Sequence, residues 1–201
     1  MAKTHPAGWS SLPRDLMQPH PDLLETLRQA QRFGFFGARP MEEAVGHSAS
    51  FVAALATSGP LDSIIDLGSG GGLPGLVIAD SYRDTPVVLT DRREKRTDFL
   101  ERAVSRLGFQ HVSVFAGDVE AICRRVESGG LAPFSAVTAR GFGPPETTLR
   151  FARRLMSASG LVVISEPPTG NRWDDALLDD LELTSVLLGQ VRFFQRTREH
   201  G

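Results

Sequence analysis

A run of glycines is the part of the 201-residue chain best suited to chemistry. From Asp66 to Gly75 the sequence reads Asp-Leu-Gly-Ser-Gly-Gly-Gly-Leu-Pro-Gly, directly after a short apolar run typical of a buried strand. Glycines let a backbone turn tightly and approach a ligand closely, because no Cβ stands in the way. Pro74 suits the first turn of a helix, where no N–H is needed. The run predicts a nucleotide-binding loop at the carboxyl end of a strand, where open α/β sheets bind ligands.

Two kinds of ligand compete for this loop. Gly70, Gly72 and Gly75 match the dinucleotide fingerprint. Asp66 and the alternate glycines that begin at Gly68 match the pattern of class I methyltransferases, which bind S-adenosylmethionine. The second interpretation is favoured, since a carboxylate would repel a pyrophosphate but attract the methionine ammonium of S-adenosylmethionine. A structural turn without a ligand is the third interpretation.

Acidic residues also follow the next two predicted strands. Asp91 stands at the end of the second strand, where a carboxylate can accept both ribose hydroxyls of a nucleoside. Asp118 and Glu120 follow the third strand, where class I methyltransferases hold the adenine ring. Asp91 and Asp118 could instead cap the helices that follow them. Candidate positions at the ends of three successive strands are more specific than any one alone.

The elements that must position these residues alternate between strands and helices. Continuous apolar runs predict strands, and apolar residues at helical spacing predict helices. Strands are expected at residues 63–67, 86–90, 111–115, 134–138 and 160–165, and helices at 74–81, 94–107, 118–127 and 145–157. Residues 181–188 and 191–196 are expected to form a hairpin around Gly189-Gln190. The alternation predicts a parallel sheet with helices on both faces and an antiparallel edge.

Two more helices are expected before the first strand. One begins after Asp22, a suitable N-cap, and the other covers residues 41–56 with one apolar face. We expect residues 22–58 to form a helical cap on the substrate side and residues 59–201 to form the core of the same domain. Residues 1–21 contain four prolines and no periodicity, and we expect an extended arm there.

Composition excludes several functional classes. The one cysteine, Cys123, rules out an internal disulfide and a multi-cysteine metal site, and we expect it to be a packed small residue. No apolar run approaches the roughly 18 residues of a membrane span, and the N-terminus lacks the apolar segment of a signal peptide. We therefore expect a cytoplasmic protein with no membrane partner and no bound metal. The net charge of −2 does not favour nucleic-acid binding by charge alone, although 20 of the 22 basic residues are arginines, which suit phosphate contacts.

Over residues 37–160 the chain resembles the bacterial 16S ribosomal RNA guanine-N7 methyltransferases, the glucose-inhibited division protein B family. The strongest motif is the glycine run with Leu73-Pro74-Gly75, which marks that family. The further similar motifs are Lys95-Arg96 with Phe99-Leu100, Val119-Glu120, and Thr138-Ala139-Arg140-Gly141-Phe142. The resemblance implies a class I, Rossmann-like, doubly wound α/β fold. It also implies methyl transfer from S-adenosylmethionine to N7 of a guanine in 16S ribosomal RNA, with that RNA or the small ribosomal subunit as partner.

The resemblance and the loop argument together define candidate site residues. The candidate cofactor contacts are Asp66, Gly68, Ser69, Gly70, Gly72, Leu73, Asp91, Arg92, Asp118, Val119, Glu120 and Arg140. Arg140 is implied to face the acceptor as well, although it could pair with a local acid. Arg92 belongs to a charged run that could equally be a solvated helix face.

His47, Arg140 and Glu166 are the candidates for the chemical step. His47 falls where the family has a histidine, although it could be structural. Glu166 follows the fifth strand, and a carboxylate there could stabilise the cation formed when guanine is methylated at N7. No general base is required, because N7 carries a free lone pair and no proton.

The chain departs from the family on the presumed acceptor side. Only His47 remains of the usual segment before the first strand, and Glu-Pro-Pro at 166–168 stands where the family has Lys-Gly. Asp118 stands where the family often has arginine. These changes remove positive or polar character. They leave open a methyltransferase that acts on a small molecule or another acceptor, and a module that binds S-adenosylmethionine without catalysis.

Overall fold

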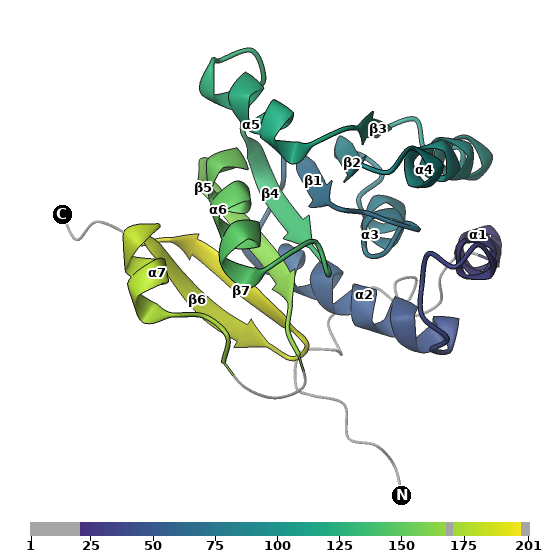
Figure 1. Cartoon of the computed structure of the whole chain (residues 1–201), viewed down its shortest axis with the longest axis horizontal. Coiled ribbons are helices and arrows are strands. Elements are labelled where there is room, and N and C mark those ends of the chain that lie inside the picture. Colours follow the sequence, from purple (N-terminus) through teal and green to yellow (C-terminus); the bar gives the residue numbers. More distant parts are fainter. Residues whose placement is uncertain (1–20, 168–170, 198–201) are drawn as a thin grey trace, which may run out of the picture.

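The computed structural model describes residues 21–167 and 171–197. Within these residues seven strands form one sheet in the order β3-β2-β1-β4-β5-β7-β6. The strands are β1 (Ile64–Leu67), β2 (Val87–Asp91), β3 (Val112–Ala116), β4 (Phe134–Ala139), β5 (Met156–Ser165), β6 (Leu183–Leu188) and β7 (Val191–Arg196). Strands β1 to β5 are parallel, and the β6–β7 hairpin adds an antiparallel edge (Figure 1). The predicted fold class is therefore confirmed.

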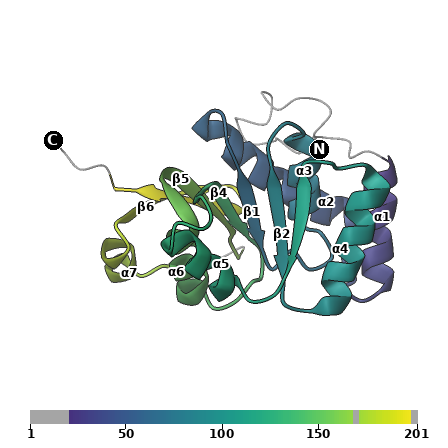
Figure 2. The same ribbon diagram turned by 90° about the horizontal axis from the view of Figure 1, so that it is seen from above.

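Helices cover both faces of the sheet (Figure 2). One face carries α1 (Pro21–Arg32), α2 (Met41–Leu55), α3 (Gly75–Ser81) and α4 (Glu94–Leu107), and a 3-10 turn (Ala56–Ser58) follows α2. The other face carries α5 (Val119–Glu127), α6 (Pro145–Leu155) and α7 (Asp175–Asp180). Each face has its own buried apolar cluster, and Cys123 is fully buried in the second one, as expected for a packed residue.

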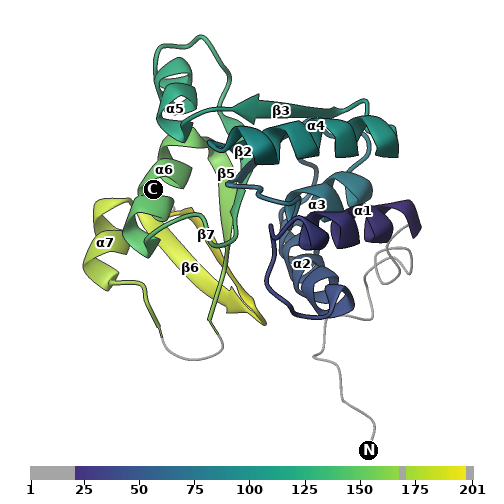
Figure 3. The ribbon, with the colours of Figure 1, turned by 45° about the vertical axis from the view of Figure 1, so that its right-hand side comes forward.

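Helix α2 buries the apolar face that its spacing predicts. The buried residues of that face are Ala44, Val45, Ser48, Val52 and Leu55. The Ser48 hydroxyl donates to the Ala44 carbonyl oxygen at 3.0 Å, so this buried polar group is satisfied within the helix. Figure 3 shows α2 lying beside α3, the helix that begins at the end of the glycine loop.

The connection between α1 and α2 folds against the glycine loop. A Cβ added at Gly71 would lie 2.6 Å from Cζ of Phe36 and 3.0 Å from the Cβ atoms of Ala30 and Phe35. Phe35 also packs edge-on against Phe99 of α4, with 5.6 Å between ring centroids. Glycine is therefore required at position 71 for the close approach of the two segments.

Some element boundaries differ from those expected. Helix α6 ends at Leu155 and β5 begins at Met156, because Met156 pairs with Phe134 at the start of β4 before an irregularity in register. This pairing outweighs the helical spacing seen in the sequence. Asp22 lies inside the first turn of α1 rather than before it, and the short helix α7 was not expected. The expected arm lies outside the described residues except for Pro21, which begins α1.

Candidate functional site

The glycine loop follows β1 and is fastened to the end of β2. The Ser69 N–H donates to the Thr90 carbonyl oxygen at 2.7 Å, and the Thr90 N–H donates to Ser69 Oγ at 3.1 Å. The Thr90 hydroxyl donates to the Asp66 carbonyl oxygen at 2.9 Å. Thr90 thus fixes the loop, a role that sequence reasoning missed because threonine in an apolar run gives no distinct signal.

The Asp66 carboxyl group is buried beneath this loop. Its Oδ1 accepts a hydrogen bond from Thr138 Oγ1 at 2.7 Å, while Oδ2 has no hydrogen-bond partner among the described residues. Burial raises the pKa of Asp66 to about 6, against the lowering effects of the Thr138 hydrogen bond and the nearby Arg140. A Cβ at Gly75 would lie 2.7 Å from Oδ2, so glycine is required there too. An unpartnered buried carboxylate oxygen is suited to receive a donor from a ligand.

A cavity of about 340 Å³ opens between the glycine loop and the α1–α2 connection. The loop contributes Gly68, Ser69, Gly70, Gly71 and Leu73 to its lining, and α1, α2 and their connection contribute Gln31, Phe35, Phe36, Gly37, Met41 and Ala44. Its charged lining residues are Arg39, Arg96 and Arg140, and no described acidic residue lines it. The cavity therefore favours a ligand, or part of a ligand, that carries negative charge.

Asp91 accepts hydrogen bonds from Gly70 and Arg96, two residues that line the cavity. Its Oδ2 accepts from the Gly70 N–H at 3.1 Å and from Arg96 Nη1 at 3.2 Å, and its Oδ1 accepts from the Arg93 N–H at 2.9 Å. Cζ of Arg96 lies 6.0 Å from the centre of the Phe35 ring. Sequence reasoning placed Asp91 at the strand end but missed its pairing with Arg96, which depends on how α4 packs.

Arg140 and His47 lie on the β4 side of the loop. Arg140 follows β4 and lines the cavity, and its Nη1 is buried without a hydrogen-bond partner. Burial lowers the pKa of Arg140, and the charge of Arg39 lowers it further. His47 Nε2 donates to the Gln190 carbonyl oxygen at 3.3 Å. Burial lowers the pKa of His47 below its ordinary value of 6.5, and the charges of Arg140 and Arg39 lower it further.

The residues expected on the adenine side lie away from this cavity. Asp118 caps α5 by accepting the Glu120 N–H at 2.9 Å. The Glu120 carboxylate accepts hydrogen bonds from Arg154 Nη1 at 2.6 Å and from Arg124 Nε at 3.3 Å. Val119 is buried in the second apolar cluster, and Arg92 is exposed. Of the predicted contacts, the structure gathers Gly68, Ser69, Gly70, Leu73 and Arg140 around the cavity, with Asp66 and Asp91 joined to them.

Glu166 is not brought to the cavity. Its side chain is only 3% exposed, Trp173 Nε1 donates to its Oε1, and Arg192 Nε lies 3.6 Å from that oxygen. Side chains alternate between the faces of a strand, so Glu166 follows Ile164 to the α5–α6 face, opposite the face that carries His47. Trp173, Arg172 and Arg192 thus enclose the Glu166 carboxylate, and a role for Glu166 beside the acceptor stays a prediction.

Glu166→Gln is expected to lower the free energy of unfolding by about 2 kcal/mol, because it leaves the half-buried guanidinium groups of Arg192 and Arg172 without their counterion. Urea denaturation measures this change. The matched control is Glu146→Gln, whose carboxylate is 64% exposed and pairs with Arg150 at the surface. The control should change stability by less than about 1 kcal/mol. Full stability of Glu166→Gln combined with loss of turnover would contradict the structural assignment.

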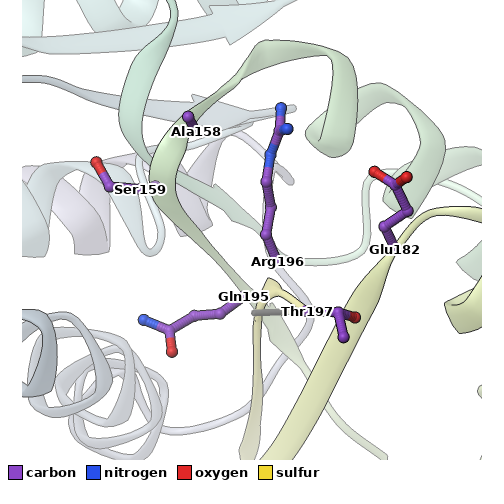
Figure 4. A pocket seen from close by; sticks show the side chains of 7 residues that line it. Ala158, Ser159, Glu182, Gln195, Arg196 and Thr197 are labelled. Carbon is purple, nitrogen blue, oxygen red and sulfur yellow. The ribbon is translucent and has the colours of Figure 1, made fainter. Parts of the chain in front are cut away.

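A larger cavity of about 600 Å³ lies at the other end of the sheet. It is lined by the first half of β5, by Glu182 and by the end of β7, and in Figure 4 the Arg196 side chain stands between Ala158 and Glu182. Gln195 pairs with Leu161 in the sheet, which places this cavity at the amino end of β5, away from the glycine loop. No helix in the described part of the chain is long and apolar enough to span a membrane.

Comparison with curated proteins gives consistent matches. The ribosomal RNA small subunit methyltransferase G of Novosphingobium aromaticivorans is 39% identical over 97 residues, which cover 48% of this chain and 39% of that protein. The protein of the same name from Chromobacterium violaceum is 30% identical over 165 residues, or 78% of this chain and 75% of that one. The chain spans about two fifths of the length of the first curated relatives that it matches.

Solved structures show the same fold at low identity. A putative O-methyltransferase from Klebsiella pneumoniae superposes with a TM-score of 0.64 at 17% identity, covering 90% of this chain and 91% of that one. The O-methyltransferase TomG from Streptomyces achromogenes, solved with SAM, gives a TM-score of 0.61 at 17% identity and covers 92% of both chains. The family model of the rRNA small subunit methyltransferase G proteins (GidB) matches residues 27–172, which include the glycine loop, Asp91, Arg140 and Glu166. By this match, and by the class I methyltransferase fold that carries the loop, the chain belongs to the GidB family of rRNA small subunit methyltransferases.

Proposed function

We propose that this protein is an S-adenosylmethionine-dependent methyltransferase that methylates N7 of a guanine in the RNA of the small ribosomal subunit. The observation that carries the proposal is the strand-end site, in which the buried Asp66 carboxylate and an arginine-lined cavity meet at a glycine loop. The names of the family and of its relatives support the RNA substrate. The solved relatives that contain SAM or SAH support the cofactor.

The residues present fit S-adenosylmethionine. Asp66 Oδ2 is a buried acceptor without a donor, which suits the ammonium of the methionine moiety. The backbone at Gly68 and Gly70 lines the cavity, so the chain can approach a ligand closely. The Asp91 carboxylate can accept ribose hydroxyls in exchange for the Arg96 guanidinium, which is 25% exposed.

Methyl transfer requires alignment of the acceptor with the methyl group and the sulfur, and it requires no proton transfer to a base. S-adenosylmethionine supplies a methyl group on a sulfonium sulfur, which an acceptor lone pair takes in an in-line displacement. The chain contributes by fixing the loop through Thr90, by covering it with the α1–α2 connection, and by presenting Arg140 at the end of β4. Guanine N7 has no proton to give, so the reaction needs no base at His47. His47 Nε2 donates to the Gln190 carbonyl oxygen in the β6–β7 turn.

The charge around the site supports an RNA acceptor. The cavity has three arginines and no described acidic residue. The carboxylate that stands where the family has Lys-Gly, Glu166, is enclosed on the other face of the sheet. The net charge of the chain is −2, so local positive charge must attract the RNA.

The test is transfer of labelled methyl from S-adenosylmethionine to small ribosomal subunits that lack this modification, followed by digestion and nucleoside analysis. The expected product is N7-methylguanosine, with a rate at least about a hundredfold lower for Arg140→Ala because alignment at the site is lost. A small-metabolite extract runs in parallel. Label only in the extract would mean a different acceptor, and no label in either sample would contradict the proposed activity.

A further inference from the structure

Charge is divided between the two halves of the strand-end site. The carboxyl ends of β1 and β2 carry the carboxylates of Asp66 and Asp91. The end of β4 and the neighbouring α1–α2 connection carry Arg140 and Arg39, which line the same cavity. The proposed function assigns the nucleoside to the half that carries Asp91, where a carboxylate can accept ribose hydroxyls, and so leaves the β4 half to the acceptor. The acceptor half of the site is therefore positive.

Arg39 is held in place by its backbone, and no carboxylate of the described residues pairs with it. Gln31 Nε2 of α1 donates to the carbonyl oxygens of Gly37 and Arg39, each at 2.8 Å. These two bonds fix the connection that carries the Arg39 side chain. No carboxylate of the described residues forms a salt bridge with Arg39 or with Arg140, whereas Arg96 is paired with Asp91 at 3.2 Å.

Arg39 and Arg140 also lie close enough to repel each other. The charge of Arg39 lowers the pKa of both Arg140 and His47, and the Nη1 atom of Arg140 is buried without a partner. The Asp66 charge raises the pKa of Arg140, but no described carboxylate forms a salt bridge with either arginine, so an anion between the two guanidinium groups would be favourable. Guanidinium groups match the geometry of phosphate oxygens.

We propose that Arg39 and Arg140 form a subsite for a backbone phosphate next to the acceptor nucleotide. This inference rests on the proposed function, since it assigns the anion to an RNA substrate. The carboxylate of the methionine moiety is the other anion available. It is disfavoured at Arg39, because Arg39 belongs to the α1–α2 connection and not to the glycine loop or to a strand end. Arg39 thus orients the RNA and does not hold the cofactor.

Arg39→Gln and Arg39→Lys test the subsite, with Arg102→Gln, an exposed residue of α4, as the matched control. Fluorescence anisotropy measures binding of a short single-stranded RNA with one guanosine to the full chain over a series of salt concentrations. A second RNA carries neutral methylphosphonate linkages on both sides of that guanosine. Calorimetry measures the affinity for S-adenosylhomocysteine.

Arg39→Gln is expected to weaken binding of the phosphate RNA about tenfold and to reduce the salt slope by about one. Arg39→Lys should retain most of the affinity, and Arg102→Gln all of it. The methylphosphonate RNA should bind wild type and Arg39→Gln equally, and affinity for S-adenosylhomocysteine should change less than about twofold, since Arg39 lies on the α1–α2 connection and not on the glycine loop.

Four results would overturn the subsite. The first two are an equal loss of affinity for both RNAs, and a parallel loss of S-adenosylhomocysteine affinity, which would assign Arg39 to the cofactor carboxylate. The other two are no effect of Arg39→Gln on RNA binding, and no binding of either RNA by the wild type. The proposed function is judged separately by methyl transfer to ribosomal subunits. Phosphate-dependent binding without such transfer would keep the subsite and refute the proposed acceptor.

Discussion

Asp66→Asn is expected to weaken S-adenosylhomocysteine binding at least about thirtyfold while making the free protein more stable at neutral pH. The loss of affinity follows because the variant removes the buried charge that would pair with the ligand ammonium. Asparagine has the same shape and keeps an oxygen for the hydrogen bond from Thr138, so the fold should be retained. Binding is measured by calorimetry at pH 7.5.

The gain in stability follows from the pKa of Asp66. Burial raises it from 3.8 to about 6, so the folded state binds the proton more tightly than the unfolded state does. The carboxyl group therefore costs little stability below pH 4, and its cost grows as the pH rises to 6 and is complete above that value. Two pKa units correspond to about 3 kcal/mol.

Urea denaturation of wild type and Asp66→Asn across pH 4 to 7.5 checks the sign. The difference in unfolding free energy should move by about 3 kcal/mol in favour of the variant as the pH rises. Asp84→Asn, at an exposed position, is the control and should show no such trend. Unchanged affinity for S-adenosylhomocysteine in Asp66→Asn would mean that this carboxylate does not face the ligand.

Gly71→Ala is expected to destabilise the protein by about 2 kcal/mol and to weaken S-adenosylhomocysteine binding about tenfold. The new Cβ would lie 2.6 Å from the Phe36 ring and 3.0 Å from the Cβ atoms of Ala30 and Phe35. The Cβ atoms are fixed to the backbone, so the α1–α2 connection must move away from the loop. Thermal unfolding should show a melting temperature lower by about 4 to 8 °C.

Gly46→Ala, also on the side of the sheet that carries α2, is the control and is expected to stabilise the protein. Nothing lies within 4 Å of a Cβ at this position of α2. Alanine there should raise the unfolding free energy by about 0.5 to 1 kcal/mol, because glycine is a poor helix residue. If the two variants had equal effects, the tight packing of the cap against the glycine loop would not be what position 71 requires.

The sheet could be predicted from the sequence because each strand is a short apolar run bounded by polar or glycine residues. The expected strand at 63–67 differs by one residue from β1, and the hairpin at Gly189-Gln190 is present. The start of β5 could not be predicted, since it depends on the pairing of Met156 with Phe134 of β4. Local spacing carries no information about such pairing.

The site could be predicted only where one segment carries it. The glycine loop and Arg140 could be recognised from their sequence motifs, and both line the cavity. Thr90 and Arg39 could not be found, because their roles depend on contacts between segments distant in sequence. The surroundings of Glu166 could not be predicted either. Its position after β5 suggested the acceptor side, but in the structure Trp173, Arg172 and Arg192 enclose its carboxylate.

The identity of the ligand at the glycine loop is tested most directly by calorimetric titration of the full chain with S-adenosylhomocysteine and, separately, with NADH. The expected result is saturable one-to-one binding of S-adenosylhomocysteine, abolished or strongly weakened in Asp66→Asn, and no binding of NADH. Binding of NADH in preference to S-adenosylhomocysteine, or binding that Asp66→Asn leaves intact, would contradict the assignment of this loop to S-adenosylmethionine.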